Sequence, residues 1–147
     1  MSLQNLLRIG RLAEHQTNAA QVAALLSAAK RGIADAGQES ISLETRFDAA
    51  YRAIMQLAML ALWANGYRPS KSVPGHHQTM IQSLVHSAGV SRDSMLVLDA
   101  LRVKRNSIDY TGAEIDEGSV EECVAAARHL LDQLRVWLAQ TKPELLA

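Results

Sequence analysis

Apolar residues recur every three or four positions along most of the chain, which is the spacing of amphipathic helices. One apolar stripe runs through residues 18–36, and two run through residues 42–64. Alternation of apolar and polar residues, which is typical of strands, does not extend over any useful length. The pattern therefore predicts an all-α fold, an up-down antiparallel helix bundle of about five to six helices.

Capping residues and glycines set the predicted helix ends. Ser, Thr and Asn side chains accept backbone N–H groups at helix starts, and glycine favours helix ends. The predicted caps are Asn18 or Thr17, Ser42, Ser91, and Ser119 in a capping box with Glu122. We expect helices over residues 3–12, 18–36, 42–65, 76–88, 91–108 and 119–142. The segment from Tyr67 to Gly75 contains two prolines and is expected to be a loop.

The helix predicted over residues 42–64 is apolar on two faces. One stripe includes Phe47, Tyr51 and Ile54, and a second includes Met55 and Met59. A helix that is apolar on two faces is usually central or lies at an interface. We therefore expect this helix either to form the centre of the bundle or to lie at an interface.

Length and composition fit one domain over residues 1–147. The chain is 48% hydrophobic, so it can bury a core of its own. Its 15 basic and 15 acidic residues argue against broad, non-specific nucleic-acid binding but leave room for local basic patches. The single cysteine excludes an internal disulfide and suits a reducing compartment. The longest apolar run, residues 57–64, is too short to cross a bilayer, so we expect a cytoplasmic protein with no membrane partner.

Arg105 is the most unusual residue of the predicted pattern. It lies on the same side of its helix as Leu98, Leu101 and Ile108. A guanidinium group stays charged and needs acceptors, so it cannot lie unpaired among core leucines. One interpretation is a structural ion pair with Asp109, four residues further along the helix.

The alternative interpretation is that Arg105 binds a phosphate or another anion. The planar guanidinium suits this role, because its donors match the oxygens of a phosphate. Asn106 and Tyr110 add polar groups nearby, and Arg102 and Lys104 make the local charge positive.

The stretch Leu-Arg-Val-Lys-Arg-Asn-Ser-Ile-Asp-Tyr at residues 101–110 resembles the HEPN domain (higher eukaryotes and prokaryotes nucleotide-binding). Residues 47–51, 66–69 and 75–77 are similar to stretches of uncharacterised bacterial members. The resemblance implies a helical bundle that forms a homodimer and binds a nucleotide or RNA. It also implies that the binding partner of the chain is a nucleotidyltransferase or the other protein of a toxin–antitoxin pair.

Many HEPN domains are ribonucleases that carry an Arg followed, after four to six residues, by a His. Arg105 and Asn106 match the start of this motif, but Tyr110 stands where a His is expected, and no His occurs from residue 105 to 115. A tyrosine has a reference pKa near 10, which suits general-base catalysis poorly at neutral pH. We therefore expect nuclease activity to be lost, and the sequence assigns no catalytic residue.

His76 and His77 are the other candidate ligand-binding residues. They follow Pro74 and Gly75 at a predicted helix start, where backbone N–H groups favour anions. They could line a cleft with Arg105, or they could be ordinary surface residues or caps. Neither the histidines nor Cys123 show metal-ligand spacing, and the chain has no glycine-rich phosphate loop, so we expect no metal and no cofactor.

Three functional hypotheses remain open. The first is a HEPN-like binding domain without nuclease activity, the second a structural protein–protein interaction module, and the third an active metal-independent ribonuclease of a toxin–antitoxin pair. The sequence favours them in that order. The first assigns ligand binding to Arg105, Asn106, Asp109, Tyr110, Arg102, His76 and His77.

Overall fold

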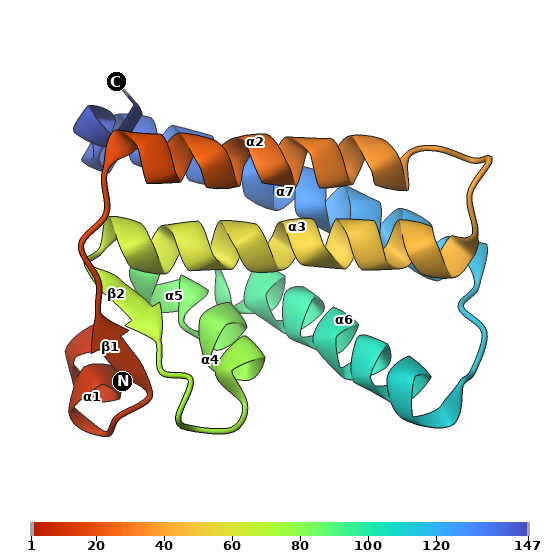
Figure 1. Ribbon diagram of the computed structural model, residues 1–147, viewed down its shortest axis with the longest axis horizontal. Helices are drawn as coiled ribbons and strands as arrows, with labels where there is room; N and C mark the ends of the chain where they lie inside the picture. The colour runs from red at the N-terminus through yellow and green to blue at the C-terminus, as the bar shows by residue number, and fades with distance from the viewer. Residues whose placement is uncertain (1, 147) are drawn as a thin grey trace.

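Helix α3 (Leu43–Ala64) is the centre of the structure, and the other long helices pack around it (Figure 1). The computed structural model describes residues 2–146. Thirteen of the 22 residues of α3 are buried, more than one apolar stripe would account for, so of the two positions that its apolar faces predict, the structure shows the central one. Helices α2 (Ala19–Ala36) and α7 (Glu117–Thr141) cover one side of α3. Helices α4 (His76–Gln82), α5 (Leu84–Ser87) and α6 (Arg92–Thr111) cover the other.

The predicted all-α helical bundle is confirmed, with seven α-helices among the described residues. The number exceeds the predicted five to six because the helix expected before Gly89 is interrupted at Ser83. The hydroxyl of Ser83 donates a hydrogen bond to the carbonyl of Met80 (2.9 Å), one turn earlier. The short α1 (Leu3–Arg8) comes before the bundle, and a 3₁₀-helix (Pro143–Leu146) follows α7.

Three of the predicted N-caps are confirmed, and one is wrong. The side chains of Asn18, Ser42 and Ser91 each accept the backbone N–H three residues further on, at 2.9–3.1 Å. Ser119 does not cap α7, because this helix begins at Glu117 with Asp116 as its N-cap. Ser119 is instead buried inside the first turn, and its hydroxyl donates to the Asp116 carboxylate.

A two-stranded antiparallel sheet joins the N-terminal segment to the chain that leaves α3. Strand β1 (Leu12–Glu14) pairs with β2 (Tyr67–Pro69), and Ala13 lies opposite Arg68. Sequence periodicity predicts a helix to residue 12 and a loop from residue 67. Both predictions are wrong at these residues, because the structure has a strand in each place. Each strand has only three residues, which is too short for an alternating pattern to be recognisable.

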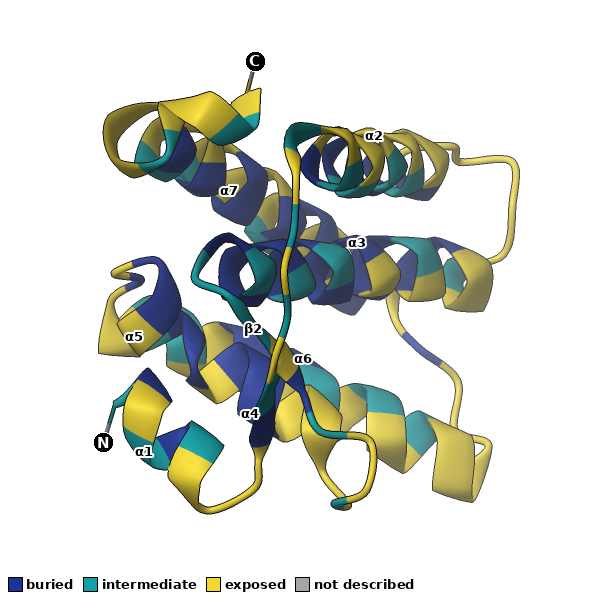
Figure 2. Cartoon of the chain, turned by 60° about the vertical axis from the view of Figure 1, so that its left-hand side comes forward, coloured by how far each residue is buried: buried dark blue, intermediate teal, exposed yellow. Residues whose placement is uncertain are grey.

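Burial is uneven between the helices (Figure 2). Only Leu98 and Leu101 are buried among the twenty residues of α6, so this helix lies at the edge of the core with most of its surface open. Within residues 2–146, no helix combines the length and the apolar character that crossing a bilayer requires.

Replacing Gly32 with alanine is expected to lower the free energy of unfolding. A Cβ atom at this position of α2 would lie 2.9 Å from the carbonyl oxygen of Ala49 on α3, so the two helices would have to separate. At an open helix position the same change raises stability by about 1 kcal/mol. Chemical denaturation measures the difference. Gly118→Ala is the matched control, because its Cβ would meet only the movable Asp116 carboxylate. A more stable Gly32→Ala variant would contradict close packing of α2 on α3.

Candidate anion-binding site

Arg105 leaves α6 toward the core and lies over the aromatic face of Tyr51 on α3. Its side chain is 29% exposed, and its guanidinium carbon is 5.3 Å from the centre of the Tyr51 ring. This distance allows a cation–π attraction. Nε of Arg105 lies 3.0 Å from Oδ1 of Asp48 and 3.7 Å from Oδ2 of Asp109. The guanidinium is therefore oriented by one aromatic ring and two carboxylates.

Asp48 is the partner of Arg105 that the sequence did not predict. It lies on α3, 57 positions before Arg105, so helix periodicity could not relate the two residues. The contact is an ion pair rather than a hydrogen bond. Nε is buried, and no acceptor within residues 2–146 is aligned with its N–H. The predicted pair with Asp109 is present but longer.

The terminal nitrogens of Arg105 differ from Nε. Within the described residues, neither Nη atom donates a hydrogen bond, and neither is among the buried unsatisfied atoms. The Nη edge of the guanidinium therefore keeps some exposed surface, while Nε is buried beside Asp48. An arginine held in this way presents two parallel donors, the geometry that binds carboxylate or phosphate in a bidentate manner.

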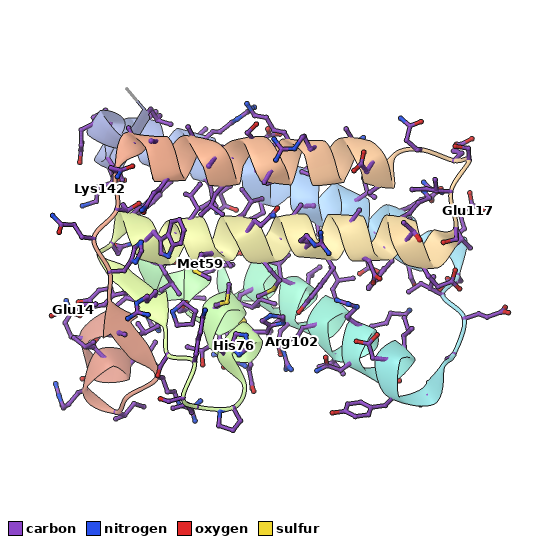
Figure 3. All side chains as sticks on the ribbon, in the orientation of Figure 1. Glu14, Met59, His76, Arg102, Glu117 and Lys142 are labelled. Atoms are coloured by element: carbon purple, nitrogen blue, oxygen red, sulfur yellow. The ribbon has the colours of Figure 1, made fainter. Side chains whose placement is uncertain are left out.

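Three more cationic or titratable side chains surround this arginine. His76 and His77 lie at the start of α4, which packs on α6, with their ring centres 4.6 Å apart. The His77 ring is 6.2 Å from the ring of Tyr51. Arg102 donates from Nε to Asp99 at 2.8 Å. Figure 3 labels His76 on α4 and Arg102 on α6, both below the central helix. We call His76, His77, Arg102 and Arg105 the cationic cluster.

The pKa shifts at this site combine the effect of burial with the charges of the neighbouring side chains. The pKa of His77 is lowered, first by partial burial and then by the charges of His76, Arg105 and Arg102. Burial raises the pKa of Tyr51 to about 12, although Arg102 and Arg105 oppose the rise. Tyr51 therefore stays protonated at neutral pH and serves as a surface for Arg105 rather than as a base.

Asn106 and Tyr110 lie apart from the cationic cluster. Tyr110 is 91% exposed, and Asn106 is also exposed. Five residues correspond to about 500° of helix rotation, so Tyr110 leaves α6 on a different face from Arg105. The structure therefore brings together four of the residues selected from the sequence, His76, His77, Arg102 and Arg105, with Asp109 at their edge.

Comparison with known proteins does not identify a family. No protein-family model, no curated protein and no solved structure matches the chain. In the described part of the chain, no three His, Cys, Asp or Glu side chains come together as a set of metal ligands. The chemistry of the site is therefore argued from its arginines and histidines.

His77 is expected to titrate below pH 6.5, and Arg105→Gln is expected to raise its pKa, because the variant removes one of the charges that lower it. The folded pKa lies below that of the unfolded chain, so the unfolded chain binds more protons between these two values. The free energy of unfolding therefore increases with pH across the interval between the folded pKa and about 6.5. This contribution is lost again as the pH falls through that interval and below the folded pKa. His77→Gln removes this dependence. An NMR titration of the imidazole protons, assigned with His77→Gln, gives the pKa. A value at or above 6.5 would contradict a partly buried His77 beside these charges, and an unchanged pKa in Arg105→Gln would contradict the contribution of Arg105.

Proposed function

We propose that this chain is a cytoplasmic HEPN-like domain that binds phosphate groups of RNA or a nucleotide at its cationic cluster. The observation that carries the proposal is the partly exposed Nη edge of Arg105, anchored by Asp48 and Tyr51 beside Arg102 and the two histidines. The resemblance of residues 101–110 to HEPN domains favours RNA and nucleotides over other anions.

Phosphate fits this surface better than a neutral ligand does. A phosphate that bridges the Nη atoms of Arg105 would accept two charge-assisted hydrogen bonds, which are stronger than those between neutral groups. The negative phosphate would also attract a protonated His77, which the neighbouring positive charges repel in the free protein. Because protonated histidines attract phosphate, binding should strengthen as the pH falls.

A second candidate function is metal-independent RNA cleavage. The observation in its favour is that His77 lies close enough to Arg105 and Arg102 for their charges to interact, with the ring of His76 4.6 Å from its own. These histidines, from another helix, could transfer protons in place of the absent motif His. The binding function ranks first, because the expected position of that His is occupied by the outward-facing Tyr110. Cleavage of RNA in the presence of EDTA that Arg105→Gln abolishes would reverse this order.

A homodimer belongs to the same proposal, as does a nucleotidyltransferase or toxin–antitoxin partner. Four large exposed hydrophobic residues lie on α6: Leu96, Val97, Val103 and Tyr110. Such a concentration of apolar surface on one helix favours a protein contact. Sedimentation at several concentrations tests the homodimer, and Val103→Lys is expected to shift the protein toward the monomer.

The competing hypothesis is a structural interaction module in which Arg105 only stabilises the bundle. The ion pairs with Asp48 and Asp109 support it. The structural hypothesis differs from the binding proposal in one respect: it assigns no ligand to the Nη atoms of Arg105.

The proposal is tested by titrating the purified protein with a fluorescently labelled single-stranded RNA of ten nucleotides. We expect saturable binding that weakens with salt. If Arg102 and Arg105 each neutralise one phosphate, the slope of log K against log salt concentration is about −1.4. A parallel titration with a nucleoside triphosphate distinguishes RNA from nucleotide binding. Absence of binding by both ligands at low salt would refute the proposal.

Asp48→Asn is expected to strengthen RNA binding while it slightly destabilises the fold. Asp48 holds the Nε side of Arg105, but its negative charge also repels a phosphate on the Nη side. Removing a unit charge about 6 Å from the phosphate in a watery environment changes binding by about 0.7 kcal/mol, roughly threefold. The loss of stability should stay within about 1 kcal/mol, since this carboxylate is half exposed. Anisotropy titration and urea denaturation measure the two effects, and unchanged or weaker binding would favour the structural module.

A further inference from the structure

A groove between α6 and α7 is separate from the cationic cluster. Its volume is about 330 Å³, and none of the four cluster residues lines it. Its walls are mostly apolar, formed by Val90, Val97, Leu98, Ala125, Ala126 and Leu130. Small-molecule sites in proteins typically have volumes of about 300–1,000 Å³ and mainly apolar linings with a few polar groups. The groove therefore has the size and lining of a site for a small ligand.

The polar side chains of the groove are without partners. They are Ser94, Glu122, His129 and Gln133, and within residues 2–146 none of their side chains forms a hydrogen bond or an ion pair. Gln133 differs from the other three, because its amide oxygen Oε1 is buried and accepts no hydrogen bond. Buried acceptors in folded proteins almost always have a donor, and leaving one without a donor is costly.

We propose that this groove binds a small, mainly apolar molecule that carries a hydrogen-bond donor, and that the donor is received by Oε1 of Gln133. The apolar walls bury the body of the ligand, and the unsatisfied oxygen selects for an N–H or O–H group. The terminal torsion of a glutamine side chain is soft, so Oε1 can turn toward the groove without leaving a favoured rotamer. The proposal does not depend on the phosphate-binding function.

Two bicyclic probes of nearly the same shape test this proposal. Indole carries one N–H donor, and benzothiophene has sulfur in its place. Each is titrated into ¹⁵N-labelled protein while the amide shifts are followed by NMR. We expect saturable shifts at Val97 and Ala126 for both probes, with indole bound about tenfold more tightly because it alone donates to Gln133.

Variants assign the preference to particular side chains. Gln133→Leu is expected to give the two probes equal affinity by weakening only indole. Ala126→Leu fills the groove and is expected to abolish binding of both, whereas Ala100→Leu, on an exposed part of α6 outside the groove, leaves both unchanged. The proposal is overturned if neither probe shifts resonances around the groove. It is also overturned if wild type binds the two probes equally, a comparison that requires no variant to fold.

Discussion

The double variant Arg102→Gln, Arg105→Gln is expected to bind the labelled RNA at least 30-fold more weakly than wild type. A hydrogen bond to a charged group contributes about 2 kcal/mol, which corresponds to roughly a 30-fold change in affinity, and the variant removes more than one such bond. It should also reduce the salt dependence of binding almost to zero, because both phosphate-neutralising charges are gone. Glutamine keeps much of the length of the side chain, so the helix is little disturbed.

Two controls separate the loss of a ligand contact from the loss of the fold. Arg31→Gln makes the same chemical change at an exposed position of α2, where Arg31 donates a hydrogen bond to Ser27 of its own helix, and is expected to bind RNA normally. Arg105→Lys keeps the charge without the planar pair of donors, so its affinity should be intermediate. If the double variant, with native helicity by circular dichroism, bound RNA as wild type does, the cationic cluster would not be the binding site.

Leu57→Ala is expected to cause the largest loss of stability, about 3 kcal/mol. Leu57 lies in the middle of α3 with no exposed surface. Its truncation therefore leaves a cavity in the central helix, on which the helices of both sides pack. For a chain of this length, the change corresponds to a melting temperature lower by roughly 10 °C. Leu96→Ala is the matched control. It removes the same atoms from a residue that is 48% exposed and should change stability by less than about 0.5 kcal/mol. Similar losses in the two variants would show that α3 is not the centre of the core.

Local interactions made most of the fold predictable. The N-caps at Asn18, Ser42 and Ser91 involve atoms only three residues apart, so residue type and spacing were sufficient. The two apolar faces of α3 predicted a helix at the centre or at an interface, and the structure shows the central position. The paired strands were missed because their hydrogen bonds join segments more than fifty residues apart. Ser119 was misassigned because Asp116, three residues earlier, also suits an N-cap.

The candidate site was only partly predictable for the same physical reason. Helical spacing placed Arg105 on the inward side of α6 and showed its need for acceptors. It could not reveal that Asp48 and Tyr51 on another helix hold it. Closeness in sequence also suggested Tyr110, which helix rotation turns to solvent. In contrast, His76 and His77 are distant in sequence but lie beside the arginines, because α4 packs on α6.

The pKa of His77 with and without saturating RNA, followed by NMR, tests the central claim most directly. In the free protein, partial burial and then the neighbouring charges hold this pKa below its usual value. A phosphate bound at Arg105 brings negative charge next to the imidazole, so the pKa should rise on binding. The same experiment with Arg105→Gln should show almost no further rise on addition of RNA. A His77 pKa that is unchanged by RNA in the wild-type protein would contradict phosphate binding at the cationic cluster.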